Sequence, residues 1–168
     1  MLRSLPTLIL LGAIGFLAGC SSAGPYSYRY IPGETATVQA GYAVAPPSAP
    51  PVVHAAIAAG NRIAGLPYCY GAGHTREPSA AYDCSGAASY VLCQAGLLDE
   101  PTTSRAFRNY GTRGEGKWIS VYARHGHVFM VVAGLRFDTG WGGGATGPKW
   151  TTRGRPSNGA VVRHPPGL

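Results

Sequence analysis

The chain has 168 residues, enough for one domain with a sizeable core, and a formal net charge of +7 from 14 basic and 7 acidic residues. Only 12% of residues are charged, and 25 Gly and 14 Pro predict a loop-rich protein with few long surface helices. The basic residues are scattered and form no Lys/Arg stripe, which argues against a nucleic-acid-binding protein. The charge favours contact with an anionic polymer or a membrane surface.

The segment 1–19 has the pattern of a secretion signal: a basic residue, Arg3, is followed by an apolar run. The run from Leu5 to Ala18 is shorter than the roughly 20 residues that a membrane-spanning helix needs. The closing sequence "LAGC" resembles the lipobox of bacterial lipoproteins. This resemblance implies cleavage before Cys20, modification of its thiol with more than one lipid chain, and stable anchoring to a membrane. The alternative is an ordinary signal peptide with a chance cysteine.

Residues 20–51 are rich in Ser, Ala, Gly and Pro and have no sustained apolar period, which predicts a flexible tether. The remaining residues, 52–168, are expected to form the functional domain. Its first part predicts two helices. One covers 52–65, with Pro51 suited to a first turn, and the other covers 84–98, with Gly96 suited to the C-terminal cap.

The second part of the domain has strand patterns. Alternating or short apolar segments predict strands within 117–123, 127–134, 135–140 and 160–164 of an antiparallel sheet. Because the helices come first and the strands later, we expect an α+β fold with N-terminal helices packed on a small antiparallel β-sheet.

Three cysteines remain if Cys20 is lipidated, and they are not equivalent. Cys84 follows Asp83, a good N-cap residue, and stands where a helix begins, so the positive end of the helix dipole favours its thiolate. Cys93 lies inside the same helix among apolar residues, where a thiol stays protonated. A disulfide between Cys69 and Cys93 would leave Cys84 as a free thiol, but sequence alone gives no distances to test it.

A cysteine nucleophile needs a general base, and "HGHVFMVV" supplies two histidines at the start of a predicted strand. His127 adjoins the apolar run and is favoured over His125. Asp138 follows His127 by eleven residues, so two adjacent antiparallel strands would bring them together. The residues Cys84, His127 and Asp138 therefore predict a Cys–His–Asp triad. No metal site is expected, since the sequence has no C-x-x-C or H-x-x-x-H spacing.

The order "GLPYCYG", "YDCSGAASYV", "GHVFMVV", "FDTG" resembles the NlpC/P60 family of cell-wall cysteine peptidases over about residues 52–168. The resemblance implies a papain-like NlpC/P60 fold, with Cys84 as nucleophile, His127 as base and Asp138 as the third polar residue. It also implies that Tyr68 assists at the oxyanion or holds substrate.

By the same resemblance, Asp83 and Ser85 help to hold the free amine of a stem peptide. The implied substrate is peptidoglycan, cut between γ-D-glutamate and a diamino acid, with no cofactor. Differences from the family pattern include Ala72 in place of a glycine and a longer loop before Cys84. They leave substrate preference open.

Two other functions stay open from the sequence. One is an amidase or acyltransferase of the same fold, and the other is a wall-binding lipoprotein without activity. The second is disfavoured because binding needs no thiol at a helix start. The expected protein is a monomer in the cell envelope. Ser21 after Cys20 is no retention signal, so the expected anchor is the outer membrane, facing the periplasm, if the cell has two membranes.

Overall fold

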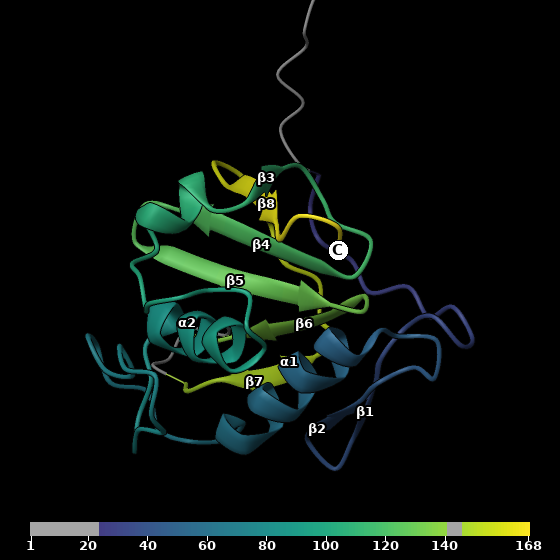
Figure 1. Cartoon of the computed structure of the whole chain (residues 1–168), viewed down its shortest axis with the longest axis horizontal. Helices are drawn as coiled ribbons and strands as arrows, with labels where there is room; N and C mark the ends of the chain where they lie inside the picture. Colours follow the sequence, from purple (N-terminus) through teal and green to yellow (C-terminus); the bar gives the residue numbers. More distant parts are fainter. Residues whose placement is uncertain (1–23, 141–145) are drawn as a thin grey trace, which may run out of the picture.

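A computed structural model describes residues 24–140 and 146–168 (Figure 1). The elements in chain order are β1 (Thr37–Gln39), β2 (Tyr42–Val44), α1 (Pro51–Ile63), α2 (Cys84–Gln94), a 3-10 helix η1 (Ala106–Asn109), β3 (Thr112–Arg113), β4 (Ile119–Arg124), β5 (His127–Val132), β6 (Leu135–Asp138), β7 (Lys149–Thr151) and β8 (Val161–His164). The predicted signal segment 1–19 and the predicted lipidation residue Cys20 lie outside the described residues.

The main sheet has six antiparallel strands in the order β3-β8-β4-β5-β6-β7, and α1 and α2 lie together over one of its faces (Figure 1). The central strands are covered on both faces, and β4 is buried from Ile119 to Ala123. One face contributes Val121 and Met130 to the main core beneath the helices. The other face carries Tyr122 and Phe129, whose rings stack with centroids 4.7 Å apart.

Both predicted helices are present, and each begins where the sequence indicated. Pro51 is a first-turn residue of α1, where its missing N–H costs no hydrogen bond. The helix packs closely, since a Cβ at Gly60 would lie 2.4 Å from the ring of Trp150. The residues of α2 are almost all buried, and Gly96 after its C-terminal cap has a positive φ of 70°.

The four predicted strands are confirmed as β4, β5, β6 and β8, but the predicted fold is wrong. We expected a papain-like fold with N-terminal helices on a small sheet. Instead, the β1–β2 hairpin precedes both helices, and the main sheet has six strands, so most elements are β. The missed strands have two or three residues each, which is too short to show the alternation that identifies a strand.

The predicted flexible tether is also wrong for its described part, residues 24–51. Tyr26 is 7% exposed, and its backbone forms two hydrogen bonds of 2.9 Å with Arg155. Ala36 is fully buried, and the side-chain amide of Asn61 in α1 bonds both the N–H and the C=O of Ala43. The sequence hid this because small side chains without periodicity give no core signal, and their partners lie far along the chain.

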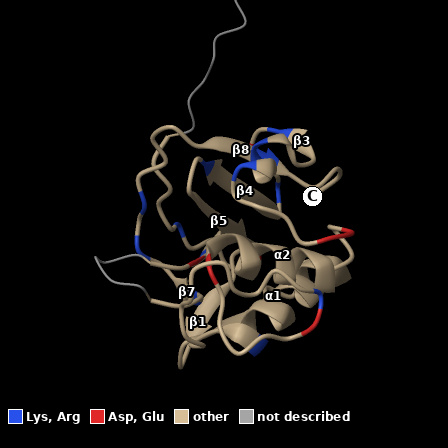
Figure 2. Cartoon of the chain, turned by 90° about the vertical axis from the view of Figure 1, so that its left-hand side faces the viewer, with Lys and Arg blue, Asp and Glu red and all other residues tan. Residues whose placement is uncertain are grey.

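The few charged residues are scattered along the fold, and several basic residues lie on and around β3 and β8 (Figure 2). Among the described residues, none of the helices has both the length and the apolar character that crossing a bilayer requires.

We predict that Tyr26→Ala destabilises the fold by about 3 kcal/mol, because it removes a buried ring. Its hydroxyl also donates a 2.8 Å hydrogen bond to the carbonyl of Gly134. Urea unfolding measures this change. The matched control is Tyr30→Ala in the same segment, where the side chain is 55% exposed and a change within about 0.5 kcal/mol is expected. Equal stability of the two variants would show that residues 24–36 are a loose tether after all.

Candidate active site

The site is built around the first turn of α2, which begins at Cys84. Asp83 is the N-cap residue, and its Oδ1 accepts a 2.7 Å hydrogen bond from the backbone N–H of Gly86. The first two N–H groups of the helix, those of Cys84 and Ser85, have no acceptor within the helix and point to its N-terminal side. The half-buried thiol of Cys84 therefore lies at the positive end of the helix dipole.

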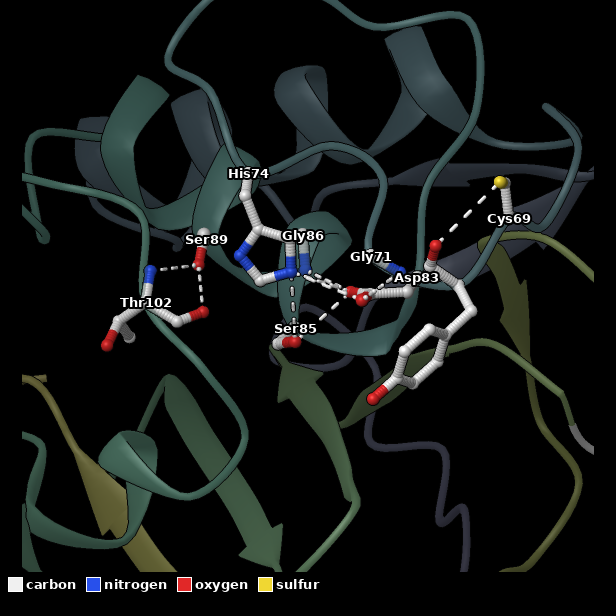
Figure 3. A network of polar contacts seen from close by, with 9 residues as sticks. Cys69, Gly71, His74, Asp83, Ser85, Gly86, Ser89 and Thr102 are labelled. Carbon is white, nitrogen blue, oxygen red and sulfur yellow. Dashed lines mark hydrogen bonds and ion pairs between the residues drawn. The ribbon is translucent and has the colours of Figure 1, made fainter.

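Asp83 also holds the loop that leads into the helix (Figure 3). Its Oδ2 accepts a 3.0 Å bond from the N–H of Gly71, and His74 Nε2 lies 3.1 Å from its Oδ1. The hydroxyl of Ser85 donates to the same Oδ1 at 3.1 Å and lies 3.3 Å from His74 Nε2. Asp83 and Ser85 are both 6% exposed and face this network.

The pKa of the Asp83 carboxyl lies below its usual value. Burial, the largest single cause, raises this pKa, but hydrogen bonds from the Gly86 N–H, from His74 and from the Gly71 N–H together outweigh it. The cap is therefore a carboxylate that is well supplied with donors.

Close packing holds this loop against the helix. A Cβ at Gly86 would lie 2.2 Å from the carbonyl oxygen of Ala72, and the Asp83 N–H donates to that same oxygen at 3.1 Å. Only glycine at position 86 allows so close an approach. In the "CSG" sequence, Gly86 thus allows the close backbone packing that holds the loop beside Cys84.

His127 and Asp138 meet on one face of the main sheet. His127 Nε2 lies 2.9 Å from Asp138 Oδ1, and the carboxylate has no exposed surface. The β5–β6 register pairs Met130 with Phe137, and one further pair would bring Asp138 opposite Phe129. His127, two residues before Phe129, then points to the same face and lies diagonally across from Asp138. The pairing expected from the sequence is present.

The pKa of His127 indicates that Cys84 is a neighbour of the imidazole. Burial lowers the pKa of His127, but hydrogen bonds with Asp138 and with Cys84, together with their charges, raise it above its usual value. Because Nε2 faces Asp138, Nδ1 is the nitrogen left for the thiol. The pKa of His127 thus responds to Cys84 as well as to Asp138, and the 2.9 Å contact with Asp138 fixes the orientation of the imidazole. His125, the alternative base, is exposed.

Two arginines surround the far side of the Asp138 carboxylate. Arg155 Nη1 lies 2.6 Å from Oδ2, and Arg136 Nε lies 3.5 Å from the same oxygen. Both arginines are buried. The backbone N–H of Thr139 donates to Oδ1 at 2.8 Å. Asp138 thus joins a cluster of buried charges that the sequence analysis did not identify.

Tyr68 lies close to the thiol. Burial raises the pKa of its hydroxyl, and the neighbouring Cys84 and Asp83 raise it further, which places Tyr68 within electrostatic reach of both. Tyr68 pairs through a parallel bridge with Tyr82, the residue before Asp83, so the chain holds it beside the start of α2. Its phenol stays protonated and can donate a hydrogen bond near Cys84.

The other two cysteines are free thiols in different surroundings. Cys93 is 6% exposed in α2, where burial raises its thiol pKa, so it is a packed residue as the sequence predicted. Cys69 is exposed. The disulfide between them that the sequence left open is absent, because both residues are free in the described chain.

Sequence reasoning missed two residues of this site, His74 and Arg155. His74 lies in the enlarged loop before Cys84, nine residues before Asp83, and its place in that insertion was its only signal. Arg155 comes from an irregular segment after β7, and nothing in its local sequence connects it to Asp138.

Within residues 24–140 and 146–168, no group of three or more His, Cys, Asp or Glu side chains could hold a metal ion. Neither a protein-family model nor a curated protein matches the chain. The interpretation of the site therefore depends on its own geometry and chemistry.

We predict that Asp83→Ala lowers the free energy of unfolding at pH 7 by about 2 kcal/mol, because helix and loop lose their common acceptor. The folded pKa of Asp83 is depressed, so its contribution is full above the unfolded pKa of about 4 and is lost as the pH falls through the folded value. The difference between wild type and variant should therefore shrink between pH 7 and pH 3 in urea unfolding.

The control for this variant is Asp99→Ala, at an exposed carboxylate after α2, with an expected change within about 0.5 kcal/mol. A loss for Asp83→Ala that is the same at pH 7 and pH 3 would contradict a role for the ionised cap.

Proposed function

We propose that the protein is a cysteine peptidase that hydrolyses peptidoglycan stem peptides, in line with its resemblance to the NlpC/P60 family. The observation that carries the proposal is the 2.9 Å contact of His127 with the buried carboxylate of Asp138, with Cys84 at the start of α2 raising the pKa of the same imidazole. This is the arrangement of a thiol nucleophile, a base and a group that orients the base.

In the first step, the Cys84 thiolate attacks the carbonyl carbon of the amide bond and forms a tetrahedral oxyanion. The N–H groups of Cys84 and Ser85 at the helix start, with the Tyr68 hydroxyl, are the donors available to stabilise it. The protonated His127 then gives its proton to the amine as the carbon–nitrogen bond breaks. The acyl group is left on Cys84 as a thioester.

In the second step, neutral His127 takes a proton from water, and the resulting hydroxide attacks the thioester carbonyl. The carbon–sulfur bond breaks, the acid product leaves, and Cys84 returns to the thiolate beside a protonated His127. Asp138 keeps Nε2 of the imidazole occupied throughout, so that Nδ1 stays directed at the thiol. No step uses a metal or a redox cofactor.

For the substrate we propose the bond between γ-D-glutamate and a diamino acid. The net charge of +7 supports an anionic partner of this kind, because stem peptides carry several carboxylates. Binding of a stem-peptide amine by Asp83 and Ser85 has less support, since both side chains are already bonded to each other and to His74.

The proposal is tested by incubating the mature protein with purified sacculi and identifying the released fragments by mass spectrometry. Wild type should release fragments cut after D-glutamate. Cys84→Ala and His127→Ala should each lower the rate by a factor on the order of 10³ or more. The matched controls Cys93→Ala, in the same helix, and His125→Ala, in the preceding turn, should keep most of the activity.

Fragments cut at another amide would support an amidase in place of the proposed peptidase. Binding of wild type to sacculi without any release would overturn the proposal in favour of a wall-binding protein. Loss of activity in His125→Ala rather than in His127→Ala would contradict the assignment of the base.

We also propose that Cys20 carries lipid and holds the protein in the cell envelope, which would be the outer membrane in a cell with two membranes. Cells fed an alkyne-tagged fatty acid should label the wild-type chain and its Cys69→Ser variant, but not Cys20→Ser. Cys69 is the suitable control because its thiol is exposed. Equal labelling of Cys20→Ser would contradict lipidation at this residue.

A further inference from the structure

Arg155 and His127 share one buried carboxylate. Asp138 directs Oδ1 to His127 Nε2 at 2.9 Å and Oδ2 to Arg155 Nη1 at 2.6 Å. The side chain of Asp138 has no exposed surface, that of Arg155 is 6% exposed, and that of His127 is 16% exposed. Water therefore screens these interactions little, and each charge has a strong effect on the others.

The two oxygens have different partners, and this division fixes the carboxylate. With Oδ2 held by the guanidinium, Oδ1 is left to His127 and to the N–H of Thr139. Arg136 approaches Oδ2 only to 3.5 Å and gives a 3.0 Å hydrogen bond to the carbonyl of Gly154. Arg155 thus makes the shortest charged contact of Asp138 among the described residues.

Arg155 is itself held in place from two sides. Its backbone N–H and C=O both pair with Tyr26, at 2.9 Å each, so the N-terminal segment fixes its main chain. Its guanidinium carbon lies 5.4 Å from the centre of the Phe129 ring, on the strand that carries His127. Ser157 donates a 2.6 Å hydrogen bond to the carbonyl of Gly24, which extends the contact between the two segments.

We propose that Arg155 is a positioning residue of the active site: it shares the Asp138 carboxylate with His127, orients Oδ1, and limits how strongly that carboxylate holds the His127 proton. This rests on the proposed function, in which His127 must both give and take a proton. Each cation that shares a buried carboxylate weakens its hold on the imidazolium, and Arg155, at 2.6 Å, makes the shorter of the two arginine contacts with Asp138.

The titratable and charged groups around His127 come from several elements. They are the Cys84 thiol from α2, Asp138 and Arg136 from β6, Arg155 from the segment after β7, and Arg124, the cross-strand neighbour on β4. Of these, Arg155 donates a 2.6 Å hydrogen bond to the carboxylate that His127 uses. Removing its charge should therefore strengthen the hold of Asp138 on the imidazolium.

The experiment is an NMR titration of the full mature chain with ¹³C-labelled histidine, in which His127→Gln identifies the His127 signal. In Arg155→Gln, the titration midpoint of His127 should rise by about one pH unit, the order expected for one charge at this range in a protein interior. Arg155→Lys retains the charge and should restore the midpoint to within about 0.3 units of wild type.

The matched control is Arg153→Gln, which changes the net charge equally at an exposed arginine two residues away and should leave the midpoint within about 0.3 units. If Arg155→Gln does not fold, Arg155→Met is used in its place, because its chain can still pack on Phe129. An unchanged or lower His127 midpoint in the folded charge-loss variant would overturn the proposal, since Arg155 would then not limit how strongly Asp138 holds the His127 proton.

This titration needs no substrate, so it separates the two proposals. A raised midpoint together with no release from sacculi would leave the role of Arg155 in the site intact and would overturn the peptidase assignment. Release of fragments from sacculi with an unchanged His127 midpoint would support the peptidase assignment and overturn the proposed role of Arg155.

Discussion

The buried carboxylate of Asp138 is the interaction on which the arrangement of the site depends. A carboxylate without exposed surface is stable only when its charge is matched and its oxygens accept hydrogen bonds. Here the partners are His127 from β5, the N–H of Thr139 directly after β6, and Arg155 from the segment after β7. Through the backbone pairing of Arg155 with Tyr26, the N-terminal segment belongs to the same assembly. One charge thus ties distant parts of the chain to the histidine beside Cys84.

The start of α2 supplies the other half of the site by local means. Asp83 caps the helix and holds the preceding loop through Gly71 and His74, while Gly86 allows the backbone of Ala72 to approach closely. Cys84 is then the first helical residue and half-buried beside Tyr68. The Asp83 carboxylate that caps the helix already accepts hydrogen bonds from Gly86, Gly71 and Ser85. This weakens the case for its binding a substrate amine.

The start of α2 could be predicted from the sequence more fully than the surroundings of Asp138. The start of α2, the packed position of Cys93 and the strands β4, β5, β6 and β8 follow from local patterns, and the structure has them. The contact of His127 with Asp138 follows from two adjacent strands and a short turn. By contrast, the β1–β2 hairpin and the packing of Tyr26 were missed, because strands of three residues and isolated aromatic side chains carry no periodic signal.

By itself, the sequence determined the elements whose causes are local: the cap at Asp83, the apolar strands, and a thiol placed where a helix dipole acts on it. Only the tertiary structure decided that six strands form one sheet, that residues 24–51 pack onto it, and that Arg155 reaches Asp138. The physical reason is the separation along the chain between the residues that interact. Capping and periodicity act within a few residues, whereas the partners that neutralise a buried charge lie farther along the chain. Arg155 comes 17 residues after Asp138, and Tyr26, which pairs with the backbone of Arg155, comes from the opposite end of the described chain.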